Sequence, residues 1–277
     1  MSKSKITAFP YVIWMIVFIV VPLLLVAYFA VTTEPQFTVD NIWTIDNLSQ
    51  VGRFGPVLMR SAVLAAVATV ICLVICYPLS YIIARSFGSR QRTLLMLTIL
   101  PMWMNFLLRT YAWMTLLENN GLINRFLSLF GIGPFQMINT GGAVILGMIY
   151  NYMPFMILPL YSVMTKIDNT TIEAARDLGA NGQNVFLRVI LPLSMPGIKT
   201  GITMVFVPSV STFIISRMLG GGGNLLIGDL IDLQFLGNAY NPNLGAAISL
   251  VLMVIILLFM SIFNQFGDEE EMEGTLL

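Results

Sequence analysis

One short polar segment organises this chain: Glu173-Ala174-Ala175-Arg176-Asp177-Leu178-Gly179, which Val189-Ile190-Leu191-Pro192 follows ten residues later. Thr170 and Glu173 have the spacing of a capping box, in which a hydroxyl and a carboxylate satisfy open backbone N–H groups at a helix start. A short helix is therefore predicted to begin at Thr170. Gly179 is predicted to end it, because glycine adopts the left-handed conformation that follows many helices at the lowest cost.

The first helix is expected to bury a modest apolar face, formed by Ile172, Ala175 and Leu178. A second short helix is predicted from about Gln183 to Arg188, and Pro192 then favours extended backbone at the residue before it. Residues 168–192 are therefore predicted to form a helix-turn-helix segment, called the elbow below, in a loop between two apolar spans.

The spacing resembles the EAA loop of importer-type ABC transporter permeases, whose pattern is Glu-Ala-Ala, three residues, Gly, nine residues, then Ile-x-Leu-Pro. This chain differs only at Val189, where the pattern has Ile. The resemblance implies a coupling helix that inserts into a cleft of a cytosolic ATPase, with small side chains for close approach and Glu173 as its cap. The coupling residues that it implies are Glu173, Ala174, Ala175, Gly179, Leu191 and Pro192. The alternative is an ordinary capped helix in a cytosolic loop.

The composition is that of a polytopic membrane protein. Of 277 residues, 57% are hydrophobic and 10% are charged, and the mean hydropathy is +0.85. The net charge is zero, which gives no reason to expect nucleic acid as a partner. Histidine, the commonest metal ligand and general base, is absent. Cys72 and Cys76 lie in one apolar span and are expected to be small buried hydrophobic residues, not a disulfide or a metal pair.

Six apolar stretches are predicted to cross the bilayer as α-helices, for which the hydrocarbon core requires about 20 residues. They cover residues of about 6–31, 61–84, 93–117, 143–163, 200–215 and 244–266. The expected fold is all-α, a single transmembrane domain over residues 1–277 with the elbow between the fourth and fifth spans. The first apolar run is too long for a signal peptide and is expected to remain uncleaved.

Positive charge predicts the orientation of the chain. The side of the predicted termini carries Lys3, Lys5, Arg85, Arg90, Arg92, Lys166, Arg176, Arg188 and Lys199. The opposite side carries Arg53, Arg60, Arg125 and Arg217. Because positive residues remain inside, both termini and the elbow are expected in the cytosol, with the chain in the plasma (inner) membrane. The acidic tail, residues 268–273, does not oppose this orientation, since acidic residues count little in the rule.

The chain has no evident energy source of its own. It lacks the phosphate-binding loop of ATPases, and the run Gly220 to Gly223 is expected to be a flexible turn outside the membrane. The six predicted spans contain no Asp or Glu, which gradient-driven carriers commonly use for ion coupling. Energy for transport is therefore expected from a partner subunit, which agrees with the coupling helix.

Arg109 is the one ionisable residue inside a predicted span. On a straight helix from Thr93 it would rise about 24 Å and reach the outer interface by snorkelling. Its role is either structural, as an ion pair or interfacial anchor, or part of the substrate passage.

Acidic and aromatic residues on the outer side are candidates for the substrate pathway. Asp229 and Asp232 are three residues apart, so on a helix they lie on the same face. This face is a candidate lining for an outward-facing cavity that attracts cations. The alternative is that both residues are solvated carboxylates in a loop. Glu118, Trp103 and Tyr111 would add charge and cation–π contacts for an ammonium ligand. Interfacial belts and packing explain the aromatic residues equally well.

Four further stretches resemble the spermidine/putrescine permeases of ABC importers: Pro101–Asn105, Arg109–Tyr111, Met153–Tyr161 and Asn224–Gly228. The resemblance implies a heterodimer with a second, homologous permease. It also implies two copies of a cytosolic ATPase, which bind ATP and Mg²⁺, and an extracytoplasmic polyamine-binding protein. No cofactor is expected in this chain.

The sequence thus predicts a polyamine permease subunit that contacts membrane lipid and performs no chemistry. The nearest alternative is an ABC importer permease for another solute: an oxoanion, an amino acid or a thiamine-like cation. Arg109 and Arg217 would then be anion contacts. A membrane-embedded enzyme is disfavoured, because histidine and a carboxylate pair within the spans are absent. A third alternative is a scaffold or sensor subunit that does not transport.

Overall fold

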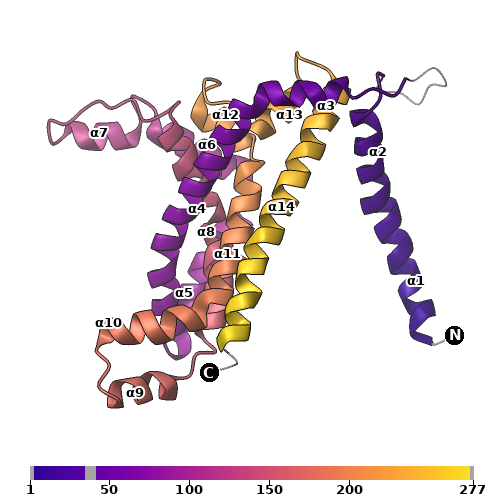
Figure 1. The fold of residues 1–277 in the computed structure, drawn as a ribbon. Helices are drawn as coiled ribbons and strands as arrows, with labels where there is room; N and C mark the ends of the chain where they lie inside the picture. Colours follow the sequence, from indigo (N-terminus) through magenta and orange to yellow (C-terminus); the bar gives the residue numbers. More distant parts are fainter. Residues whose placement is uncertain (1–2, 35–41, 275–277) are drawn as a thin grey trace. The chain divides into compact units, whose positions relative to one another are not determined.

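The computed structural model describes residues 3–34 and 42–274, with side chains described for residues 9–34 and 42–263. These residues form helices and turns, and Figure 1 shows no sheet among them; an isolated antiparallel bridge joins Thr32 and Trp43. The predicted all-α class is confirmed. The chain divides into two compact units: unit 1 is Met1–Pro56 with Leu230–Phe259, and unit 2 is Val57–Asp229 with Met260–Leu277.

Five helices among the described residues are long and apolar enough to cross a membrane. They are Phe9–Ala30, Asp46–Ala84, Gly141–Met164, Gly182–Val210 and Pro242–Phe263. A sixth span arises if the bent pair Gly88–Trp103 and Phe106–Ser128 counts as one. The side chains of Lys3, Lys5 and residues 268–273, used above for the orientation, lie outside the described side chains.

In unit 1, the first span is one continuous helix of three parts: α1 (Lys3–Met15), the π-helical turn η1 (Ile16–Val20) and α2 (Val21–Ala30). The widened turn lies directly before Pro22, and the Val21 N–H donates to the carbonyl of Ile16. Proline lacks an N–H and its ring clashes with the carbonyl four residues earlier. One extra residue in the turn relieves this conflict without breaking the helix.

Two buried asparagines hold the end of α2 in unit 1. Asn47, on α3 (Asp46–Val51), donates from Nδ2 to the carbonyl of Thr32 at 2.9 Å. Asn243, at the start of α14 (Pro242–Gly274), donates to the carbonyls of Phe29 at 3.0 Å and Thr32 at 2.7 Å. Carbonyls at and just beyond the end of a helix have few partners within it, and these amides supply them with side-chain hydrogen bonds. The short η2 (Gly52–Phe54) follows α3.

The centre of unit 2 is formed by α4 (Gly55–Ala84), α8 (Gly141–Met164) and α11 (Leu191–Val210). Small residues let α11 approach α8: a Cβ on Gly201 would lie 2.6 Å from the Met156 sulfur, and one on Gly197 would lie 3.0 Å from the Pro159 carbonyl. Cys72 and Cys76 are free and buried in this core, as predicted, with their sulfurs 3.7 Å apart.

The predicted third span is not a straight helix. It divides into α5 (Gly88–Ile99) with η3 (Leu100–Trp103), then α6 (Phe106–Leu117) followed by α7 (Leu122–Ser128), and the two halves are bent by 93°. Asn105 starts the second half, because its side-chain oxygen accepts the backbone N–H groups of Leu107 and Leu108. An N-cap at this position favours a new helix over continuation of the old one.

The predicted fifth span, residues 200–215, is displaced in the structure. One continuous helix runs from Gly182 to Val210 through α10 (Gly182–Val185), η4 (Phe186–Ile190) and α11. The predicted extended backbone before Pro192 is wrong, since Leu191 is helical with φ −63° and ψ −49°. A π-helical turn again precedes the proline, and the Leu191 N–H donates to Phe186. The short α12 (Ile214–Gly220) follows separately.

Candidate functional site

The elbow forms one end of unit 2, at the foot of α4 and α8 (Figure 1). Its first helix, α9, covers Asn169–Asp177, and its cap is Asp168, whose Oδ1 accepts the backbone N–H of Thr170 at 3.1 Å. The predicted capping box is therefore wrong. Asp168 takes the N-cap position, where its charge also favours the positive end of the helix, so Thr170 lies inside α9. Glu173 is exposed in the middle of α9 and is not its cap.

Gly179 ends α9 as predicted, with φ +85°. The Gly179 N–H donates to the carbonyl of Arg176 at 2.8 Å, and the Ala180 N–H donates to that of Ala175 at 3.1 Å. These two bonds form a Schellman motif, which requires a left-handed residue and therefore favours glycine. The backbone leaves the helix in one defined direction and can return as α10.

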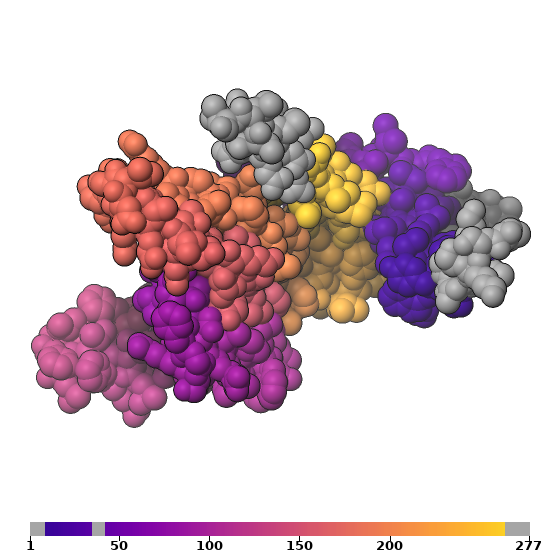
Figure 2. Space-filling model, turned by 90° about the horizontal axis from the view of Figure 1, so that it is seen from below, coloured from indigo at the N-terminus to yellow at the C-terminus, as the bar shows by residue number. Residues whose placement is uncertain are grey.

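The elbow has a small core of its own. Ile172 is buried with Ile167, Val185 and Ile190, and Ala175, Ala180 and Tyr81 of α4 pack against this cluster. The predicted burial of Leu178 is wrong, because it is 90% exposed. The prediction assumed that Leu178 lies within the helix. It is instead the C-cap of α9, with φ −77° and ψ 9°, so its side chain leaves the apolar face of the helix. Glu173, Ala174 and Leu178 therefore remain on the surface, and Figure 2, seen from below, shows the elbow on this face of unit 2.

Arg85, which directly follows α4, joins that helix to the start of the elbow. Its Nη1 donates to the carbonyl of Ile167 at 3.1 Å and to Oδ1 of Asn169 at 2.5 Å. The guanidinium lies 5.5 Å from the ring centroid of Tyr81, which itself packs on the elbow core. The sequence identified Arg85 only as a positive charge near the cytosol. In the structure its contacts bridge two elements 82 residues or more apart.

The second arm of the elbow is fixed to the spans as well. The ring of Phe186 in η4 meets that of Tyr77 in α4 edge to face at 5.7 Å, and the Tyr77 hydroxyl lies 2.8 Å from that of Ser194. Leu191 is partly buried in the central core, whereas Pro192 is exposed. Because η4 continues into α11 without a break and Arg85 bonds to the start of α9, the elbow is attached to both α11 and α4.

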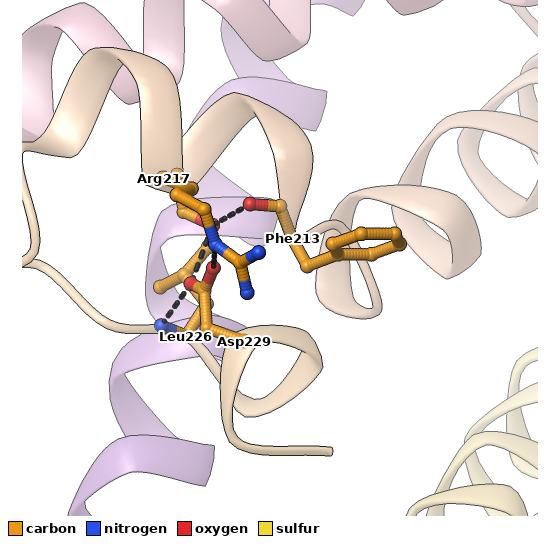
Figure 3. A network of polar contacts seen from close by, with 5 residues as sticks. Phe213, Arg217, Leu226 and Asp229 are labelled. Carbon is orange, nitrogen blue, oxygen red and sulfur yellow. Dashed lines mark hydrogen bonds and ion pairs between the residues drawn. The ribbon is translucent and has the colours of Figure 1, made fainter. Parts of the chain in front are cut away.

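The opposite end of unit 2, called the distal end below, contains α6, α12 and the first residues of α13 (Ile227–Leu236). Asp229 is fully buried there, and Figure 3 shows its polar contacts. Its Oδ2 accepts from the Ser216 hydroxyl at 2.5 Å and from the Leu226 N–H at 2.9 Å. Its Oδ1 lies 3.9 Å from Nε of Arg217, whose guanidinium is 5.9 Å from the Phe213 ring. These contacts favour a role for Asp229 in joining α12 to α13. Asp232 is half-buried on α13.

The predicted path of Arg109 to the outer interface is wrong, because the helix that should carry it is broken. Arg109 is buried, and its Nη1 donates to the carbonyl of Pro101 at 3.0 Å across the bend. Its guanidinium lies 6.0 Å from the rings of Phe106 and Tyr150. The Pro101 carbonyl thus accepts a second, charge-assisted bond besides that from the Met104 N–H, and Arg109 ties α6 to η3 across the bend.

The remaining predicted residues lie in different environments. Glu118 is exposed and lines a mainly polar pocket of about 420 Å³ at the distal end, together with Asn119, Asn120 and Asn139. Trp103 is 88% exposed at the end of η3, and Tyr111 is exposed on α6. Asn139 carries no signal in the sequence, and it stands out only in the structure, as the one non-glycine residue with positive φ among those described.

Residues 76–267 match the family described as binding-protein-dependent transport system inner membrane component. The chain belongs to this family. It is 38% identical over 269 residues to the spermidine/putrescine transport system permease protein PotB of Haemophilus influenzae, covering 94% of this chain and 92% of that one. It is 37% identical over 255 residues to PotB of Salmonella typhimurium strain LT2, covering 90% and 88%.

A crystal structure of a bacterial ABC transporter involved in the import of alginate supports the fold of this family member. The two chains superpose with a TM-score of 0.79 at 16% identity, covering 96% of this chain and 94% of that one. The chain therefore has the ABC importer permease fold, and it is a multi-pass inner-membrane transport subunit, not an enzyme. Family membership implies a partner permease, an ATPase and a substrate-binding protein. The elbow lies within the matched residues.

Proposed function

We propose that this chain is the permease subunit of an ATP-driven importer that moves polyamines such as spermidine and putrescine across the plasma membrane. The substrate assignment is supported by the 37–38% identity, over 90% or more of the chain, to proteins named as spermidine/putrescine permeases. Family membership implies a partner ATPase as the energy source. This agrees with the sequence, which contains no phosphate-binding loop.

In the proposed complex, this chain forms a heterodimer with a second, homologous permease, and each permease contacts one of two ATPase copies that hold ATP and Mg²⁺. An extracytoplasmic polyamine-binding protein delivers substrate to the distal end. Both termini and the elbow face the cytosol: Lys166, Arg176 and Arg188 lie in or beside the elbow in the sequence, and Arg85 bonds to its start. The six spans act as one transmembrane domain.

The elbow is the proposed coupling element. The exposed residues Glu173, Ala174 and Leu178 of α9 enter a cleft of the ATPase, and the Schellman turn at Gly179 fixes the angle between α9 and α10. Closure of the ATPase dimer around ATP displaces α9. Arg85 and η4 then carry that displacement into α4 and α11, which exchanges inward for outward access.

Uptake of labelled spermidine tests this function, in cells that lack the chain and in the same cells with the chain restored. These cells must have no second polyamine system, and unlabelled putrescine and sulfate serve as competitors. We expect uptake to be lost without the chain, regained with it, and inhibited by putrescine but not by sulfate. Uptake that is independent of the chain would remove the substrate assignment. Competition by sulfate would indicate that the transported substrate is an anion and not a polyamine.

A further inference from the structure

The pocket beside Glu118 is built over the last turns of two helices of unit 2. Glu118 is the C-cap of α6, and its N–H donates to the carbonyl of Met114, which also lines the pocket. Met218, in the last turn of α12, lies on the other side. The pocket volume of about 420 Å³ lies in the range of small-molecule sites, roughly 300–1,000 Å³.

The lining of this pocket favours a cation. Its one charged side chain is the carboxylate of Glu118, and Asn119, Asn120 and Asn139 add amide groups whose oxygens accept hydrogen bonds. A helix C-terminus carries a partial negative charge, which stabilises cations within the last turn. Here α6, a helix of 12 residues, ends at the pocket, so its dipole and Glu118 act in the same direction.

The turn that presents Glu118 is rigid. The Gly121 N–H donates to the Glu118 carbonyl at 2.8 Å, and Nδ2 of Asn124 donates to the same carbonyl at 3.3 Å. A Cβ on Gly121 would lie 2.5 Å from the carbonyl of Leu116, so the turn packs directly on the end of α6. The backbone of Glu118 is therefore fixed before any ligand arrives, which reduces the entropic cost of binding.

The opposite wall is held in an unusual conformation. Asn139 has φ +63°, and its N–H donates to the carbonyl of Leu219 at 2.9 Å. Gly221, with φ +62°, packs against it, because a Cβ there would lie 2.2 Å from Oδ1 of Asn139. The Gly220–Gly223 run was expected to be a flexible turn. Through Gly221 it also packs against Asn139. Non-glycine residues with left-handed backbone are concentrated at binding and active sites.

From this geometry we infer that the pocket is a binding site for an alkylammonium group, namely one protonated amine of the polyamine. The inference rests on the proposed function and adds a site to it. Glu118 pairs with the ammonium, the three asparagines supply neutral acceptors, and the thioethers of Met114 and Met218 contact the methylene chain next to it. The pocket would receive the amine on its way from the binding protein to the spans.

The test uses the complete permease–ATPase complex in liposomes, with the loaded polyamine-binding protein and labelled spermidine. Glu118→Gln preserves the shape and removes the charge, and we expect it to lower uptake about three- to tenfold, because the pair is charge-assisted but partly exposed. Asn120→Lys introduces a competing ammonium at an exposed position and is expected to lower uptake at least as much. Asp46→Asn, an exposed carboxylate on α3 outside the pocket lining, is the matched control and should leave uptake unchanged.

Two further measurements separate the possible origins of a loss. Binding of the loaded binding protein to the complex, and ATP hydrolysis without that protein, should be the same in Glu118→Gln as in the unmodified chain. Weaker binding of the binding protein would instead assign the pocket to a basic side chain of that protein and overturn the inference. Normal uptake by both pocket variants would also overturn it. If the unmodified complex takes up no spermidine, the proposed function itself fails.

Discussion

The elbow and the distal end of unit 2 are stabilised by different kinds of contact. Contacts between residues close in sequence set both ends of α9: the Asp168 side chain caps it and the turn at Gly179 ends it. The long-range bonds of Arg85 then attach the start of the elbow to α4. At the distal end, side chains join segments far apart in sequence. The Ser61 hydroxyl accepts the N–H of Ile227 at 2.8 Å across 166 residues, and Nη1 of Arg60 donates to the carbonyl of Gly223 at 3.2 Å.

This difference suits the work of each end. A coupling element must keep its own shape while it moves against a partner, and local bonds move with it. At the distal end, long-range bonds join α4 to Gly223 and to Ile227, the first residue of α13. We therefore expect substitutions at the distal end to affect the stability of the chain, and substitutions in the elbow to affect the coupling of ATP hydrolysis to uptake.

The largest effect on stability is expected from Asp229→Ala. This change removes the acceptor of the Leu226 N–H and one of two acceptors of the Ser216 hydroxyl, which also donates to the Phe213 carbonyl at 2.9 Å. The orphaned buried N–H costs about 1–3 kcal/mol, so a loss of about 2 kcal/mol is expected. Thermal unfolding of the purified complex measures it, and the yield of assembled complex should fall as well.

Two variants control the Asp229 experiment. Asp229→Asn keeps an acceptor oxygen for the Leu226 N–H and should have intermediate stability. Asp232→Ala removes a half-buried carboxylate from the same helix and should cost less than Asp229→Ala. Equal unfolding temperatures for Asp229→Ala and Asp232→Ala would show that burial of the Asp229 network does not set the stability of the distal end.

A smaller effect on stability, but a clear one on coupling, is expected from Arg85→Met. Methionine keeps an apolar stem over Tyr81 and removes the donors to Ile167 and Asn169. These charge-assisted bonds hold the start of the elbow to α4, so their loss is expected to lower uptake per ATP hydrolysed severalfold. Simultaneous measurement of uptake and ATP hydrolysis in liposomes gives this ratio.

Arg85→Lys is the matched variant for the same experiment. It keeps the charge and can donate one bond to the elbow, so it should lose less coupling than Arg85→Met. If Arg85→Met retains the normal ratio of uptake to hydrolysis, α11 alone transmits the movement of the elbow.

The smallest effect distinguishes the two candidate caps of α9. Asp168→Ala removes the observed N-cap bond and is expected to destabilise α9 by about 1 kcal/mol. Thr170→Ala, inside the helix, should change stability by less than about 0.5 kcal/mol. Hydrogen exchange of the α9 amides reads out both variants. Faster exchange in Thr170→Ala than in Asp168→Ala would restore the capping box.

The elbow was largely predictable because its determinants are neighbours in sequence. Gly179 ends α9 where the pattern requires it, and Ile172 and Ala175 face the elbow core. In α9 the errors are of one residue or two: the cap is Asp168 rather than Thr170, and Leu178 is exposed. Both arise because several nearby side chains can fill a local role, and the fold selects one of them.

The broken third span and the continuous helix through Pro192 were not predictable from local pattern. Asn105 can cap a helix or lie within one, and proline can end a helix or be accommodated by a π-helical turn. The choice depends on what surrounds the segment. At the bend, Arg109 binds the Pro101 carbonyl, and at η4, Phe186 packs on Tyr77. These contacts come from residues whose proximity the sequence does not state.

By itself the sequence determined the membrane class, the all-α fold and the position of the elbow, because hydrophobicity and helix end signals act over a few residues. Only the tertiary structure decided that Asp229 is buried with Ser216 and Arg217, that Arg85 holds the elbow, and that Asn139 faces the Glu118 pocket. The cost of burying a charge depends on partners that the fold brings from distant positions, so the roles of these polar residues appear only once the helices are packed.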